Sequence, residues 1–146
     1  MHPLVSGGCN VRSTMRVKRQ IRVTAIVTDK LKEEMQQELQ ESIDRVDASQ
    51  RELEARSRRF LLQLPSADMV SAARRELEAE TRRHEQLRRE LKERQEEVAA
   101  LKPGERIPYT TLEGEVEISV GDNLIDKLSG AEIVIKDGVV QEIKEA

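Results

Sequence analysis

Apolar residues recur at intervals of seven along two stretches of the chain that are nearly equal in length. Such a repeat keeps one stripe of a helix turned toward a partner, so each stretch is predicted to be a helix that packs lengthwise. The pattern is typical of a coiled coil. The first ladder contains Leu39, Val46, Leu53 and Phe60, and the second contains Val70, Leu77, His84, Leu91 and Val98.

A short turn is expected between the two helices. No Gly or Pro occurs in residues 29–64, whereas Pro65 cannot continue a helix. A Lys-Pro-Gly sequence at residues 102–104 ends the second run. Because the two arms are about equal, we predict that residues 29–101 form an antiparallel coiled-coil hairpin with its turn near residues 65–67.

Antiparallel folding about this turn also predicts a register, in which position i lies beside roughly position 131 minus i. The seam between the helices is then apolar at both ends and polar in the middle, and a polar layer of this kind commonly fixes register. Small residues, Ser57 and Ala73, thin the seam toward the turn. The expected pairs are Leu39 with Leu91, Ile43 with Leu87, Val46 with His84, Leu53 with Leu77, and Phe60 with Val70. Gln50 is expected to meet Glu80 or Thr81. The expected register-setting polar residues are Gln50, Glu80 and His84.

The regions that flank the hairpin follow a period of two, which is typical of strands. Residues 15–28 alternate β-branched with basic side chains, so they are predicted to form a strand with one wet, basic face. Residues 102–146 are predicted to form a small C-terminal β domain, in which Asp137 and Gly138 suit a two-residue type I′ turn. The predicted fold class is α+β, with the helical hairpin projecting from a small antiparallel sheet of the N-terminal and C-terminal strands.

Charge supports this arrangement of strands. Overall the formal net charge is −3, but residues 1–28 hold five bases and no acid, whereas residues 102–146 hold five bases and ten acids. The acidic wet face of residues 115–119 is therefore expected to lie beside the basic first strand. With 36% charged and 1% aromatic residues, the chain is poor material for a large globular core.

The N-terminal segment offers little chemistry. Residues 1–14 are predicted to be a flexible tail, and Met15 is a candidate physiological start. A single cysteine, Cys9, excludes an intrachain disulfide and gives no sign of an oxidising compartment. Because no signal peptide or apolar stretch of membrane-spanning length is evident, we expect a cytoplasmic protein that does not contact membranes.

No catalytic or cofactor-binding motif is found. The chain lacks a phosphate-binding glycine loop and a serine elbow, and Cys9 has no nearby base. Glu80 and His84 are four residues apart, which is half of a metal site, but no second His or Cys lies at ligand spacing. We therefore expect a protein that is not an enzyme and takes no cofactor, metal or small-molecule substrate.

Basic and apolar residues gather on both sides of the predicted turn. They are candidate partner contacts for a phosphate group or an acidic protein surface. Two simpler interpretations stay open, because nearby glutamates can neutralise the arginines through i,i+4 pairs and the apolar residues can merely cap the hairpin end. The candidate contacts are Arg56, Arg58, Arg59, Phe60, Leu61, Leu62, Met69, Val70, Arg74 and Arg75.

A family resemblance follows from the order of these parts. The strand and helix start VTAIVTDKLKEEM, the charged helical run, and the segments EVEISVGDNL and EIVIKDGVVQEI resemble the YlqD family of uncharacterised bacterial proteins over about residues 16–145. The resemblance implies a cytoplasmic bacterial protein, and it supplies no catalytic residues to transfer.

Two functional hypotheses result. The first is a non-enzymatic coiled-coil interaction protein, an adaptor or assembly factor that binds an unidentified protein and associates with itself. Self-association can use the hairpin end or a mixed stripe of the second helix. The alternative is an RNA- or ribosome-associated accessory factor that uses the arginines near the hairpin tip. The mixed stripe contains Ala73, Glu80, Leu87, Arg94 and Leu101.

Overall fold

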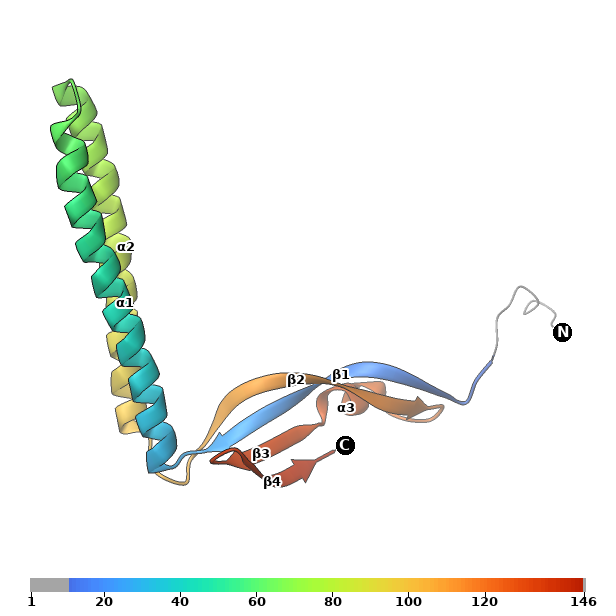
Figure 1. Ribbon diagram of the computed structural model, residues 1–146. Helices are drawn as coiled ribbons and strands as arrows, with labels where there is room; N and C mark the ends of the chain where they lie inside the picture. The colour runs from blue at the N-terminus through green and yellow to red at the C-terminus, as the bar shows by residue number, and fades with distance from the viewer. Residues whose placement is uncertain (1–10, 146) are drawn as a thin grey trace. The chain divides into compact units, whose positions relative to one another are not determined.

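A computed structural model describes residues 11–145, which contain three helices and four strands and divide into two compact units (Figure 1). One unit is a helical hairpin from Asp29 to Lys102, and the other is a sheet formed by the residues on either side of it. The predicted tail, with Cys9 and His2, lies for the most part outside the described residues. The elements are β1 (Thr14–Ile26), α1 (Asp29–Leu62), α2 (Ala67–Ala100), β2 (Arg106–Ser119), α3 (Leu124–Ser129), β3 (Glu132–Lys136) and β4 (Val139–Lys144).

The two long helices begin and end where the sequence favours it. Asp29 places a carboxylate in the first turn of α1, near the positive end of the helix dipole. Pro65 lies in the turn between the helices, and Ser66 caps α2 by accepting a hydrogen bond from the amide of Met69 at 3.2 Å. Each helix has 34 residues, so the hairpin has equal arms.

Cross-helix hydrogen bonds show that α1 and α2 pack antiparallel in the predicted register. Gln36 Nε2 donates to the carbonyl oxygen of Gln95 at 2.9 Å, and Gln50 Nε2 donates to Thr81 Oγ1 at 3.1 Å. In both pairs the residue numbers add to 131, as expected. At the same end as the Gln36–Gln95 pair, Lys32 Nζ donates to the carbonyl oxygen of Leu101 at 2.7 Å.

The seam of the hairpin is more open than the heptad pattern suggests. Ile43 and Val98 are the two fully buried residues of α1 and α2, each 1% exposed. Two expected seam residues are instead about half exposed, namely Leu87 at 45% and Phe60 at 53%. A pair of helices has no third element to cover its flanks, so only residues at the centre of the seam lose contact with water.

The sheet has four strands in the order β2-β1-β3-β4. β1 and β2 are antiparallel, and Arg16 lies opposite Glu117 while Lys18 lies opposite Glu115. The basic face of β1 thus meets the acidic face of β2, as the charges predict. β2 is longer than the apolar–polar alternation of residues 115–120 indicated. Its N-terminal half includes Pro108, near which the register between β1 and β2 shifts.

The expectation of a wholly antiparallel sheet is wrong, because β1 and β3 are parallel. β2 ends opposite Thr14, at the start of β1, and α3 then leads the chain to the other side of β1. β3 begins opposite Arg22 and runs with β1 toward Ala25. A connection that returns along the strand in this way produces a parallel neighbour.

The turn between β3 and β4 has the predicted chemistry. Asp137 and Gly138 have φ angles of 49° and 80°, the left-handed conformation that a type I′ turn requires at both positions. β3 and β4 pair antiparallel with a bulge beside Val134 and Ile135.

The buried part of the sheet is small, and it includes a charged residue. Val23, Ala25 and Val134 are at most 6% exposed. Arg19 shares the parity of the apolar residues of β1 and is 8% exposed. Its guanidinium donates to Glu145 Oε1 at 2.5 Å and to the carbonyl oxygen of Lys127 at 3.3 Å, while its Nε has no partner.

Candidate interaction surface at the hairpin tip

The turn of the hairpin brings all ten candidate contact residues to one end of the two helices. The last two turns of α1 carry three arginines and three apolar residues, and the first turns of α2 carry the rest. Residues 56–75 hold five arginines against one acid, Asp68, so this segment has a net charge of +4. We call these ten residues the tip surface.

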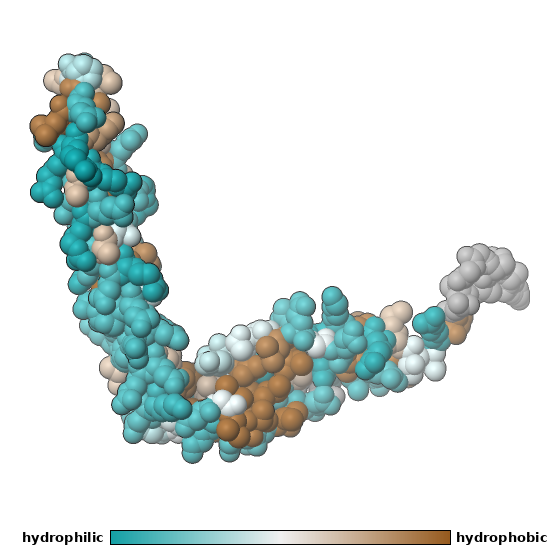
Figure 2. Space-filling model, in the orientation of Figure 1, coloured by the Kyte–Doolittle hydropathy of each residue, from teal (hydrophilic) through white to brown (hydrophobic). Residues whose placement is uncertain are grey.

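Apolar side chains on the tip surface are in contact with water. Leu62 is 87% exposed, Phe60 is 53% exposed and Met69 is 48% exposed, whereas Leu61 and Val70 are half-buried. Figure 2 shows apolar side chains beside strongly hydrophilic ones at this end of the hairpin. Capping of the helix pair therefore accounts for Leu61 and Val70 but leaves the other three side chains uncovered.

Neutralisation by neighbouring glutamates occurs at one of the five arginines. Arg56 lies 3.8 Å from Glu52, a loose i,i+4 pair on an exposed face. Arg58 and Arg75 donate only to backbone carbonyls of their own helices, at 3.4 and 3.5 Å. Arg59 and Arg74 make no hydrogen bond or ion pair within residues 11–145. Most of the positive charge is thus available to a partner.

A polar layer lies in the middle of the hairpin, as the register predicts. Gln50 donates through Nε2 to Thr81, so its Oε1 accepts from Nδ1–H of His84 at 2.6 Å. Nε2 of His84 lies 3.7 Å from Glu80. A hydrogen bond from Arg83, together with its positive charge, lowers the pKa of Glu80. Gln50 and His84 thus meet directly, whereas Glu80 mainly pairs with Arg83, and Thr81 takes the position beside Gln50.

Shallow hollows flank the seam between this layer and the tip. One, of about 380 Å³, is lined by α1 and α2 around Leu53, Ser57 and Leu77. A second, of about 440 Å³, shares Leu61, Leu77 and Thr81 with the first. The two form one continuous depression along the hairpin, at the place where small residues were expected to thin the seam.

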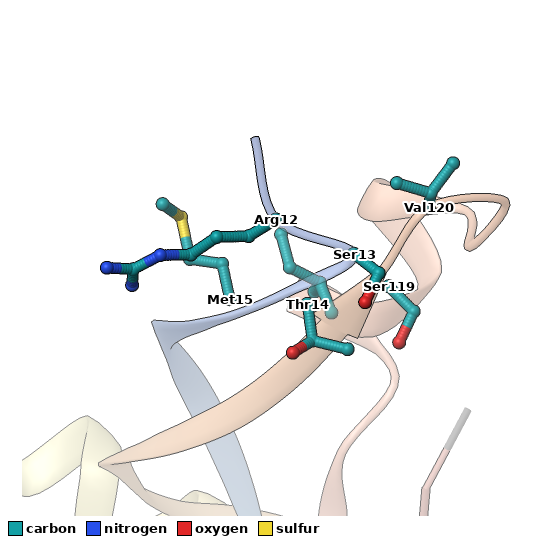
Figure 3. A pocket seen from close by; sticks show the side chains of 7 residues that line it. Arg12, Ser13, Thr14, Met15, Ser119 and Val120 are labelled. Atoms are coloured by element: carbon teal, nitrogen blue, oxygen red, sulfur yellow. The ribbon is translucent and has the colours of Figure 1, made fainter. Parts of the chain in front are cut away.

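Two other surface features carry no comparable set of groups. A hollow of about 550 Å³ at the start of β1 is lined by one charged residue, Arg12, with Met15, Val120 and small polar side chains (Figure 3). Figure 2 shows an apolar area over β3 and β4, where Val140 and Ile143 are 53% and 70% exposed. Within residues 11–145, no group of three potential metal ligands occurs, and no helix is long and apolar enough to cross a membrane.

Comparison with known proteins places the chain in a family. Residues 15–144 match the model of the YlqD protein family. A crystal structure of a protein of unknown function from Synechococcus sp. WH 8102 is 30% identical, with a TM-score of 0.83 over 91% of this chain and 98% of that one. The comparison with curated proteins gave no match. A family match over nearly the whole length shows that the chain belongs to the YlqD family.

Proposed function

We propose that the protein is a non-enzymatic interaction protein whose antiparallel coiled-coil hairpin presents the tip surface to a partner protein. The observation that carries this proposal is the presence, on one short segment, of exposed apolar side chains and arginines without carboxylate partners. The surface holds no nucleophile and no acid–base pair, which favours binding over catalysis.

The energetics of the tip surface favour a protein as the partner. Burying a Leu, Phe or Met side chain contributes about 1.5–3 kcal/mol, part of which offsets the entropy lost on association. Leu62, Phe60 and Met69 can supply this burial. The arginines around them provide charge complementarity, which steers association and selects the partner. The matching surface is an apolar pocket with an acidic rim.

A second candidate is an RNA- or ribosome-associated accessory role. It is favoured by one observation, that four of the five tip arginines lack a carboxylate partner within the described residues. Arginines in this state are available to phosphate groups. The tip, however, has a single aromatic residue, Phe60, on which a base could stack.

A pull-down from cytoplasmic extract, the compartment expected from the sequence, tests the role of the tip. Proteins bound to the chain are crosslinked to it before recovery. The double variant Leu62→Ser/Met69→Ser is expected not to recover the proteins that the wild-type chain recovers, because the apolar centre of the contact is removed. Val140→Ser/Ile143→Ser on β4 is the matched control and is expected to recover the same proteins.

Two results would change this assignment. Loss of the recovered proteins in the β4 variant, with retention in the tip variant, would contradict a contact at the tip and place it on the sheet. Recovery that disappears after ribonuclease treatment and falls steeply with added salt would establish the RNA-associated role instead.

A further inference from the structure

The depression beside the seam has a floor that is mostly apolar and can be covered by an apolar partner. We call it the lateral groove and define its floor by Leu53, Ser57, Leu61, Leu77 and Thr81. The hydroxyl of Ser57 donates to the carbonyl oxygen of Leu53 at 2.5 Å, and Thr81 Oγ1 accepts from Gln50. Both floor hydroxyls thus have a partner within the chain, and three leucines supply the rest of the surface.

Charges on the rim of the lateral groove alternate along the hairpin. On α1, Glu54 is followed one turn nearer the tip by Arg58, and on α2, Glu78 is preceded one turn nearer the tip by Arg74. In the observed register Glu54 is level with Glu78, and Arg58 is level with Arg74. The rim therefore has an acidic pair and, one turn toward the tip, a basic pair. Farther from the tip, α2 adds two more charged residues to the rim, Arg82 and Glu85.

None of the four side chains in the acidic and basic pairs forms an ion pair with another described residue of the chain. Arg58 donates only to a backbone carbonyl, and Glu54 accepts only from the neutral amide of Gln50, at 3.2 Å. Arg74 and Glu78 have no ion pair among the described residues. The alternative stripe on α2 differs in this respect, because its Arg94 already pairs with Glu97 at 2.9 Å.

We propose that the lateral groove binds the same groove of a second copy of this chain, with the two hairpins antiparallel about a two-fold axis. An axis that passes between the acidic and basic pairs places Glu54 and Glu78 of one copy opposite Arg58 and Arg74 of the other, and symmetry repeats the contact. A parallel arrangement would instead oppose like charges. The contact forms a short four-helix bundle over the leucines of the two floors.

This inference rests on the proposal that the distal hairpin is a contact surface, and it assigns one side of it to self-association. Arg58, Leu61 and Arg74 belong to both the tip surface and the groove, whereas the exposed Leu62 and Met69 are not part of the groove lining and stay available to a different partner. Dimerisation can therefore be tested with the purified chain alone, and its outcome is independent of the pull-down.

Sedimentation equilibrium of charge-swapped variants tests the two-fold contact. The wild-type chain is expected to sediment at twice its mass of 16.7 kDa. The variants Glu54→Arg/Glu78→Arg and Arg58→Glu/Arg74→Glu are each expected to weaken dimerisation on the order of 100-fold, because like charges then face each other four times. A mixture of the two variants restores opposite charges at every contact and is expected to restore the dimer.

Circular dichroism separates this effect from loss of fold, because all four substitutions lie on exposed helix positions and should leave the helical signal unchanged. A wild-type chain that stays monomeric across the concentration series would overturn the proposal. So would a dimer that both charge reversals leave intact, or a mixture of the two folded variants that stays monomeric.

Discussion

Replacing Ile43 with Ala is expected to lower the free energy of unfolding of the hairpin by about 2–5 kcal/mol, the usual cost of a buried Ile-to-Ala truncation. Ile43 is 1% exposed and is the one fully buried residue of α1. Because α1 and α2 share so little buried surface, the hairpin has few other contacts with which to offset the loss. Denaturant titration followed by the helical dichroism signal measures the effect.

A matched control lies on the same helix. Leu62→Ala removes a side chain that is 87% exposed and is expected to change the unfolding free energy by less than about 0.5 kcal/mol. Tyr109, the one tyrosine in a chain without tryptophan, lies on β2 and reports on the sheet unit separately. An Ile43→Ala hairpin as stable as the Leu62→Ala hairpin would show that the helices do not depend on this seam.

Removing the carboxylate of Glu145 is expected to destabilise the sheet by about 1–3 kcal/mol, although Glu145 is itself largely exposed. The reason is that its ion-pair partner, Arg19, is buried. The side chain of Arg19 is 6% exposed, its Nε has no acceptor, and Glu145 lies 2.5 Å from its guanidinium. In Glu145→Gln a buried cation loses its counter-charge, which costs more than an exposed ion pair.

Replacing the cation reverses this loss. In the double variant Arg19→Met/Glu145→Gln, no buried charge remains, so the sheet is expected to recover most of its stability. Denaturant titration followed by Tyr109 fluorescence compares the two variants with the wild type. If the double variant were less stable than Glu145→Gln alone, Arg19 would be stabilising through its packing rather than through the pair.

The hairpin was predictable because its signals are local and redundant. The heptad positions, Pro65 and the equal arms all favour the same antiparallel register, and Gln50 contacts Thr81 where that register places it. The type I′ turn was predictable for a similar reason, since the identities of Asp137 and Gly138 are sufficient to indicate the required positive φ angles.

Other features depended on tertiary contacts that periodicity does not encode. The direction of β3 is determined by the path of α3 around β1, so alternation within β3 did not reveal its parallel pairing. Arg19 interrupts the apolar parity of β1, and this irregularity was the one available signal that a charged group lies inside the sheet unit.

The residues of the tip surface were predictable from the sequence, but their exposure and ion pairing were not. Sequence spacing places a glutamate four residues from Arg56, Arg58 and Arg74, whereas in the structure four of the five tip arginines lack a carboxylate partner. Heptad spacing likewise placed Phe60 in the seam, but its side chain is 53% exposed. The exposure of a seam side chain depends on how much of it the neighbouring helix covers, which heptad spacing does not specify.

Site-specific photo-crosslinking tests most directly whether the protein makes its contacts through the hairpin tip. A photoreactive residue is placed at position 62 on the tip, at position 48 in the exposed middle of α1, or at position 143 on β4, and all three sites accept it without disturbing a buried contact. A contact at the tip predicts strong crosslinks to a distinct set of cellular proteins from position 62 and weak or none from positions 48 and 143. Equal crosslinking from all three positions, or crosslinking from position 143 alone, would contradict it.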